Sequence, residues 1–155
     1  MAESAFTGVW RRFDQLSVAE LHALLKLRVD VFVVEQACPY REIDGLDPQA
    51  EHYLLRDADG ALAGCLRLFA PGVNGPQARL GRIVVAPQRR GLKLGHQLVA
   101  EGIARARALH PGCAIALSAQ AHLEDFYAGH GFAAVSPPYL EDGIAHVDML
   151  LGGAD

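Results

Sequence analysis

The sequence predicts an α+β (α/β) fold in which a mixed central sheet carries helices on both faces. Short segments rich in β-branched and apolar residues alternate with segments whose apolar residues recur at helical spacing, and hairpin signals occur toward both ends of the chain. The chain has 155 residues, enough for one domain to bury a core without staples. We therefore expect residues 1–155 to form a single domain.

The first half of the chain contains a clear helix start and a hairpin turn. Ser17 and Glu20 have the spacing of a capping box, which indicates that a helix begins there. The run Asp57-Ala58-Asp59-Gly60 is typical of a hairpin turn. The expected elements are a strand over 6–13, a helix from 17 to about 34, a loop over 37–48 and strands over 52–56 and 61–69.

The second half alternates strands and helices. His110-Pro111-Gly112 is expected to end the long helix. The segment 136–143 contains two prolines and a glycine and is predicted to be a loop. The expected elements are a strand over 80–85, a helix to about 109, a strand over 114–118, a helix over 122–129 and strands over 132–135 and 145–151.

The segment from Leu80 to Leu98 has the pattern of an anion site. A buried strand ends at Pro87, a basic turn containing Gly91 follows, and a helix then begins. The first N–H groups of a helix lack partners within it, and glycines let a phosphate approach the backbone. The alternative is an ordinary strand-to-helix turn with solvated arginines. The spacing fits neither a Walker loop nor a dinucleotide fingerprint.

The composition limits the classes of partner. The net charge is −4 and the basic residues of this turn are a local group, so we expect no nucleic-acid partner. No apolar run approaches the ~18 residues of a membrane span, and no signal peptide is visible, so we expect no membrane partner. Three cysteines without a C-x-x-C pair favour reduced thiols and a cytoplasmic location. No metal-ligand spacing occurs, so we predict no metal.

Two motifs resemble the GNAT superfamily of N-acyltransferases. Val85-x-Pro-x-x-Arg90-Gly91-x-x-x-Gly95-x-x-Leu98 resembles its acyl-CoA pyrophosphate loop, and Phe126-Tyr127-Ala-Gly-His-Gly-Phe132 resembles its helix-to-strand motif. The segments 28–47, 91–95, 120–123 and 141–146 are similar to the ElaA-type subfamily, so the resemblance covers nearly the whole chain. Lys93 departs from the superfamily, which usually has Gly or Ala there, but is similar to the subfamily.

The resemblance implies a GNAT-like, mostly antiparallel sheet of about six to seven strands with a splayed acyl-CoA cleft. Acetyl-CoA would be the co-substrate, its pantetheine arm along the strand ending at Val85 and its pyrophosphate against the basic turn. The implied donor-binding residues are Ile83, Val84, Val85, Gln88, Arg89, Arg90, Gly91, Leu92, Lys93, Leu94, Gly95 and His96. For the strand residues, sheet packing is a compatible role, because backbone contacts a ligand while side chains pack.

The same resemblance makes Tyr127 a candidate general acid. A phenol can protonate the departing thiolate of CoA, although a packed tyrosine with a bonded hydroxyl is the alternative. An amine also has to lose a proton before it attacks. The central strand contains no acid, so the general base stays open among Glu35, Asp44, His122, His146 and Asp148.

The end of the first helix and the following acid-rich loop form the expected acceptor side. The candidate substrate-binding residues are Arg28, Phe32, Glu35, Gln36 and Asp44. The alternatives are a solvated acidic loop, favoured for Glu42 and Asp47, and a buried ion pair that positions the loop, which competes for Arg28 and Glu35. We expect a small-molecule or peptide amine acceptor and a monomer or homodimer.

The predicted function is acetyl transfer from acetyl-CoA to a primary amine by direct attack. One alternative is a catalytically silent acyl-CoA sensor. Another is an enzyme like the acyl-homoserine-lactone synthases, which the Arg28-x-x-Val31-Phe32 start of the acceptor region also resembles. Thiol release on a panel of amines would separate these functions.

Overall fold

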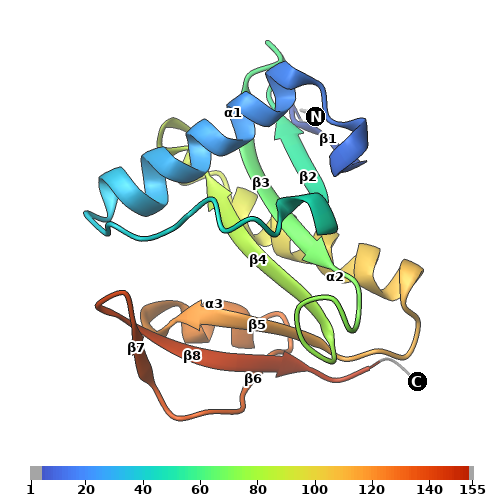
Figure 1. Ribbon diagram of the computed structural model, residues 1–155, viewed down its shortest axis with the longest axis vertical. Helices are drawn as coiled ribbons and strands as arrows, with labels where there is room; N and C mark the ends of the chain where they lie inside the picture. Colours follow the sequence, from blue (N-terminus) through green and yellow to red (C-terminus); the bar gives the residue numbers. More distant parts are fainter. Residues whose placement is uncertain (1–4, 154–155) are drawn as a thin grey trace. The chain divides into compact units, whose positions relative to one another are not determined.

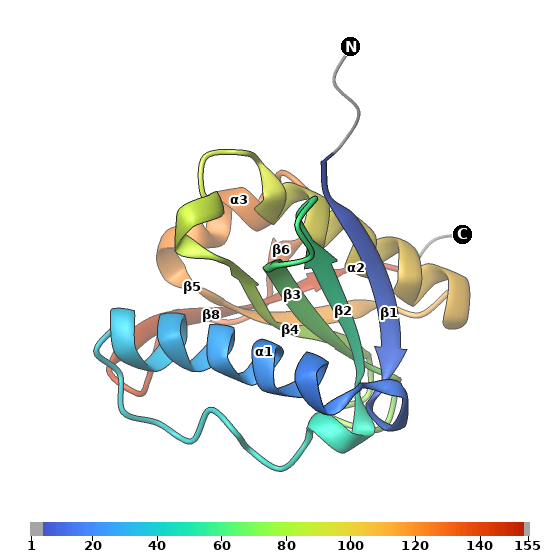
Figure 2. The ribbon, with the colours of Figure 1, turned by 90° about the horizontal axis from the view of Figure 1, so that it is seen from above.

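The structure is a computed structural model that describes residues 5–153 (Figures 1 and 2). The chain divides into two compact units, one containing residues up to Arg67 together with Arg82–Val99, the other containing Leu68–Gly81 and the residues from Ala100 onward. The strands follow one hydrogen-bonded order, β1-β2-β3-β4-β5-β8-β6, with β7 also paired to β8. Most of the pairings with a defined register are antiparallel, which confirms the predicted mixed, mostly antiparallel sheet.

The elements lie close to the predicted segments. The strands are β1 (Thr7–Arg12), β2 (Glu51–Arg56), β3 (Leu62–Phe69), β4 (Ala78–Val85), β5 (Ile115–Gln120), β6 (Ala133–Ala134), β7 (Tyr139–Glu141) and β8 (Ile144–Leu151). The α-helices are α1 (Val18–Val29), α2 (Leu94–Leu109) and α3 (Glu124–Ala128). Short helical turns cover η1 (Phe13–Gln15), η3 (Asp47–Gln49), η4 (Pro87–Arg89) and η5 (Ala121–Leu123), and η2 (Asp30–Glu35) is a π-helix.

The start of the first helix forms as predicted, but its end does not. The Ser17 side chain accepts a hydrogen bond from Glu20 N, and the Glu20 carboxylate accepts one from Ser17 N. The α-helix ends at Val29 and continues as a π-helix, in which Gln36 N donates to Val31 O. π-helical turns are often found at functional sites. The apolar spacing alone predicted one uninterrupted helix.

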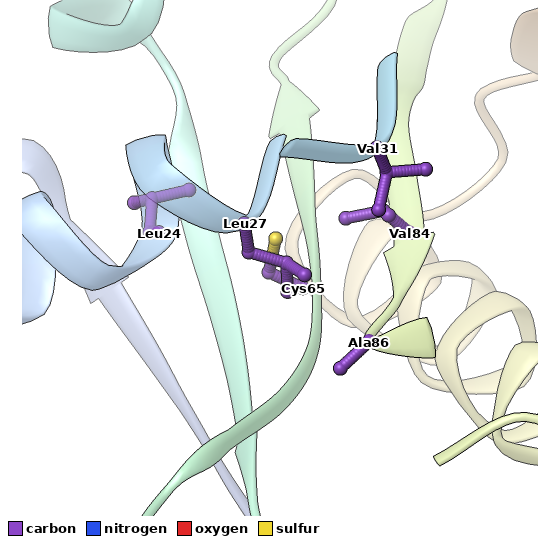
Figure 3. Close-up of a cluster of buried hydrophobic side chains, with 6 residues drawn as sticks. All are labelled: Leu24, Leu27, Val31, Cys65, Val84 and Ala86. Atoms are coloured by element: carbon purple, nitrogen blue, oxygen red, sulfur yellow. The ribbon is translucent and has the colours of Figure 1, made fainter. Parts of the chain in front are cut away.

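Helices cover both faces of the strands in the first unit, as predicted. Leu24, Leu27 and Val31 form a buried cluster with Cys65 of β3 and with Val84 and Ala86 at the end of β4 (Figure 3). On the other face of β3, a Cβ at Gly64 would lie 3.0 Å from Leu98 Cδ1 of α2. Figure 2 shows α1 and the start of α2 on opposite sides of β3. Glycine therefore lets α2 approach this strand closely.

The second unit contains one strand more than expected. β7 forms a hairpin with β8 in the segment predicted to be a loop, with Glu141 opposite Ile144. Asp142 and Gly143 connect the two strands with φ values of +52° and +78°. Positive φ at both turn positions is the geometry that an Asp-Gly hairpin adopts, so this dipeptide was the missed signal. The sheet therefore has eight strands rather than six to seven.

β4 combines a short parallel ladder with a local irregularity. In the second unit, its first residues Ala78 and Arg79 pair with Ile115 and Ala116 of β5. At Arg82, where the first unit resumes, φ is +50°, a left-handed conformation that costs a non-glycine residue free energy. Among the strands of the first unit, the remainder of β4 lies at the edge of the order β1-β2-β3-β4.

Candidate functional site

The predicted donor loop joins β4 to α2 in the first unit. Ala86 N donates to Ala63 O at 2.8 Å, so the end of the strand is held before the chain enters η4. Gly91 and Lys93 have φ values of +84° and +61°. These left-handed residues turn the chain so that α2 begins at Leu94, which is buried. Gln88 and the residues from Arg90 to Lys93 are exposed.

Lys93, the departure from the superfamily motif, has a left-handed backbone conformation. The motif usually has Gly or Ala at this position, and a left-handed backbone strains any residue with a Cβ. Lys93 tolerates that conformation, and its side chain is exposed next to the first turn of α2. The amides of that turn and the Lys93 ammonium are together suited to bind an anion.

The two arginines of the loop already have carboxylate partners. Arg90 makes a bidentate pair with Glu35 at 2.9 and 2.5 Å, and Arg89 Nη2 lies 2.6 Å from Asp57 Oδ2. The hydrogen bonds from these arginines lower the pKa values of Glu35 and Asp57. Within residues 5–153, Lys93 is the loop cation for which no carboxylate partner is found. An incoming phosphate therefore has to compete for the arginines but not for Lys93.

The predicted acceptor residues lie on the π-helix and the acidic loop, but not all of them are accessible. Phe32 is partly buried against the apolar cluster, Gln36 ends the π-helix, and Glu35 is taken up by the pair with Arg90. Arg28 is fully buried. Its Nε donates to Glu42 at 2.7 Å, and Nη1 and Nη2 donate to Asp47 at 2.9 and 3.2 Å.

These contacts belong to a charge cluster that sequence reasoning did not find. We call it the six-residue cluster; its members are Arg28, Glu42, Asp44, Asp47, Arg67 and Arg82. Arg67 of β3 bridges Asp44 and Asp47 at 2.6 and 2.9 Å. Arg82 of β4 reaches Glu42 and Asp44 at 2.8 and 3.3 Å and also lies over the Tyr40 ring. Three guanidinium groups thus balance three carboxylates.

The cluster corrects two sequence predictions. Glu42 and Asp47, for which a solvated loop was favoured, are 3% and 4% exposed. For Arg28 the structure favours the ion-pair alternative over direct substrate contact, because its guanidinium is buried and bound to two carboxylates. Asp44 is only partly buried, but its charge is matched by two arginines, so the acidic loop does not present an uncompensated charge for a cationic amine.

The arginines also determine how these groups titrate. Burial alone would raise the pKa values of Asp44 and Asp47, but the hydrogen bonds from Arg67 and Arg28 outweigh it and hold both below their usual range. His52, whose Nε2 lies 2.9 Å from Asp47 O, has its pKa lowered by burial and is neutral at pH 7. Burial raises the pKa of Cys65 to about 12, so this thiol is inert, as expected for a core cysteine.

Tyr127 lies on α3 in the second unit. Its ring contacts Phe126 and Phe132 edge-on, at centroid distances of 5.0 and 6.1 Å, and the residue is 7% exposed. Phe132 N donates to Tyr127 O at 3.2 Å, which connects the helix to the following strand. Burial raises the pKa of the phenol to about 12, so the hydroxyl keeps its proton at neutral pH. A proton donor is required to be in this state.

The remaining base candidates are distributed unevenly. His122 is exposed on η5, whereas His146 and Asp148 lie on β8 and share one face of the sheet.

In the part of the chain that the structure describes, no group of three or more His, Cys, Asp or Glu side chains is arranged to bind a metal. No described helix has the length and hydropathy needed to cross a membrane.

Comparisons with known proteins show that this chain belongs to the acetyltransferase (GNAT) family. The acetyltransferase (GNAT) domain family matches residues 20–152. The protein ElaA of Escherichia coli K12 is 39% identical over 137 residues, which cover 88% of this chain and 90% of that protein. The crystal structure of an acyl-CoA N-acyltransferase from Pseudomonas aeruginosa has a TM-score of 0.91 and 42% identity, covering 95% of this chain and 99% of that one. The crystal structure of E. coli ElaA has a TM-score of 0.88 and 36% identity, covering 94% and 99%.

Proposed function

Because the chain belongs to the GNAT family of N-acetyltransferases, we propose that it transfers an acetyl group from acetyl-CoA to a primary amine by direct attack. The observation that carries the proposal is the donor loop, in which Gly91 and Lys93 turn the backbone so that the first amides of α2 follow an exposed basic segment. We place the reaction in the cytoplasm.

The donor is proposed to bind along the end of β4 and the loop that follows. The backbone of Ile83 to Val85 belongs to the edge strand of the first unit, and an extended pantetheine arm can add to such an edge through main-chain hydrogen bonds. The residues from Gln88 to His96 would receive the pyrophosphate. Lys93 supplies a charge at once, and Arg89 and Arg90 supply theirs after leaving Asp57 and Glu35.

In the proposed reaction one bond forms, between carbon and nitrogen, and one bond breaks, between carbon and sulfur. The neutral amine nitrogen attacks the thioester carbonyl carbon with its lone pair, and the carbon–sulfur bond then breaks as the amide forms. The electron pair of that bond goes to sulfur, and the proton of Tyr127 neutralises the thiolate. The nitrogen loses one proton as the amide forms, and that proton restores the Tyr127 phenol. A thiolate with a pKa of about 8.5 is a fair leaving group, so the proton from Tyr127 is helpful rather than indispensable.

On the acceptor side, the proposal keeps Phe32, Glu35, Gln36 and Asp44 as residues next to the amine. Glu35 has a second role, because its ion pair with Arg90 connects the acceptor side to the donor loop. Arg28 is proposed to position the acidic loop. The acceptor itself is a small molecule or a peptide amine.

The test is a screen for thiol release with purified protein, acetyl-CoA and a panel of primary amines. Turnover on at least one amine is expected, together with a melting temperature raised by CoA, because a ligand that binds only the folded state stabilises it. A shift without turnover on any amine would favour the acyl-CoA sensor. Absence of a shift at millimolar CoA would contradict the donor site itself.

A pair of variants locates the donor site. Gly95→Glu adds a carboxylate in the first turn of α2, where it would repel the pyrophosphate, so the CoA-dependent shift is expected to disappear. Ala100→Glu adds the same charge at an exposed position further along the helix and should keep the shift. Equal shifts in both variants would exclude this loop as the pyrophosphate site.

A further inference from the structure

A polar cluster on one face of the second unit is not used by the donor site. Ser118 of β5 lies opposite Asp148 of β8, and Tyr139 of β7 lies opposite His146. The Ser118 and Tyr139 hydroxyls both donate to Asp148 Oδ1, at 3.0 and 2.6 Å. Side chains from two strands, β5 and β7, thus donate to one carboxylate oxygen on a third strand, β8.

The charge of Asp148 is not matched in the way that the other carboxylates are. Glu35, Asp44 and Asp57 each pair with at least one arginine. Within residues 5–153, the hydrogen-bond donors to the Asp148 carboxylate are the two hydroxyls, both on Oδ1, and Oδ2 accepts no bond. A partly buried carboxylate with one open oxygen is a binding position for a cation.

The surroundings of the open oxygen suit an ammonium group. The Tyr139 and His146 rings lie nearly parallel, with centroids 6.2 Å apart, and the face of a tyrosine ring attracts cations. Burial, followed by the hydrogen bond to Asp148, raises the pKa of Tyr139, so its phenol stays neutral and its oxygen can accept a further bond. Arg79 Nη1 approaches the cluster from the Ser118 side at 3.4 Å, and its charge would disfavour a ligand with several positive charges.

We propose that Ser118, Tyr139, His146 and Asp148 form a subsite for the primary ammonium group of the acceptor, which would be an amine with one positive charge. The ammonium would donate to Asp148 Oδ2 and to the Tyr139 oxygen, in contact with the neighbouring rings. This inference rests on the proposed amine transfer. It moves the charge recognition of the acceptor from the acidic loop to β7 and β8.

The direct test is a titration with pentylammonium chloride as the probe and with pentanol as its neutral match. Binding is monitored by the amide chemical shifts of the protein in NMR spectra, with and without saturating CoA. Pentylammonium is expected to give saturable shifts centred on the four residues, and pentanol is not. Asp148→Asn should weaken binding about tenfold, the lower end for a hydrogen bond to a charged group. Asp59→Asn, which removes one charge from the exposed hairpin turn, should leave the affinity unchanged.

A second variant protects the test against misfolding. If Asp148→Asn does not fold, Tyr139→Phe keeps the ring, removes one oxygen and should weaken the probe severalfold. Equal affinity in the folded variants and the wild type would overturn the subsite, as would shifts centred on residues 41–47 or no saturable shift in either CoA state.

Kinetics separate a failure of this inference from a failure of the proposed function. If an amine in the panel is acetylated, Asp148→Asn should raise the KM for that amine and leave the KM for acetyl-CoA unchanged. An unchanged amine KM would refute the subsite while the transferase stands. Binding of pentylammonium at the cluster without turnover on any amine would refute the transferase and leave the subsite.

Discussion

Replacing Arg28 with methionine tests whether the six-residue cluster is structural or binds substrate. Methionine keeps an unbranched apolar stem in a site that is fully buried, but it removes the guanidinium group with its charge and all three hydrogen bonds. Glu42 would then retain Arg82, and Asp47 would retain Arg67. Each carboxylate would stay buried with one partner instead of two.

The size of the effect follows from that burial. Removing one partner of a buried ion pair costs about 3–5 kcal/mol, because the remaining charge stays out of water. For a chain of this length, each 1 kcal/mol lowers the melting temperature by about 2–4 °C, so a loss of about 6–20 °C is expected. Glu42→Gln in the Arg28→Met background removes the surplus negative charge of the cluster and should recover part of the loss.

The assay is thermal and urea unfolding followed by circular dichroism. Lys26→Met on the same helix is the control, because it breaks an exposed ion pair with Asp30 and should change the melting temperature by no more than about 2 °C. An Arg28→Met protein as stable as the wild type, with a raised KM for the amine, would refute the structural assignment and return Arg28 to the substrate site.

Four further expectations can be checked with the same protein. Tyr127→Phe should keep CoA affinity and lower kcat about 10²-fold, and a kcat within about twofold of wild type would remove the phenol from the mechanism. Glu35→Gln frees Arg90 for the pyrophosphate and should tighten CoA binding about two- to fivefold by calorimetry, the range expected from an exposed ion pair, so weaker binding would contradict the competition. Lys93→Gly removes a cation without straining the left-handed backbone and should weaken CoA binding and reduce its salt dependence, whereas an unchanged salt slope would exclude Lys93 from the site. Asp44 has a pKa held below its unfolded value of about 3.9, so the stability it contributes is present above that pH and lost as the pH falls further, and Asp44→Asn should flatten the acid side of the stability curve measured by urea unfolding.

Local chemistry made the elements predictable, including the strand, turn and helix start of residues 80–98. The capping box at Ser17 and the turn at Asp57 formed as expected because their hydrogen bonds join residues within four positions of each other. The Asp142–Gly143 hairpin carried a signal of the same kind, which the neighbouring prolines obscured. The π-helix has no such signal, because its apolar face repeats much as an α-helix does.

The ion-pair partners could not be read from the chain. Arg28 bonds residues 14 and 19 positions away, and the Arg82 side chain reaches 38 to 40 positions back to the acidic loop. Nothing in the local sequence indicates which acid pairs with which arginine. An acid in a buried ion pair therefore has the same sequence pattern as a solvated acid. For the same reason the Asp148 cluster, whose members lie on three strands, was not visible: His146 and Asp148 were separate base candidates, and Ser118 and Tyr139 were not singled out.

The six-residue cluster also restricts how this chain can change over generations. Its three positive and three negative side chains neutralise one another, so losing any one leaves a surplus charge, while the loss of a matched pair does not. A lineage that abandons the network one substitution at a time must pass through destabilised intermediates. We therefore expect descendants either to inherit all six residues or to have exchanged acids and arginines together, and the acidic loop to drift more slowly than other surface loops.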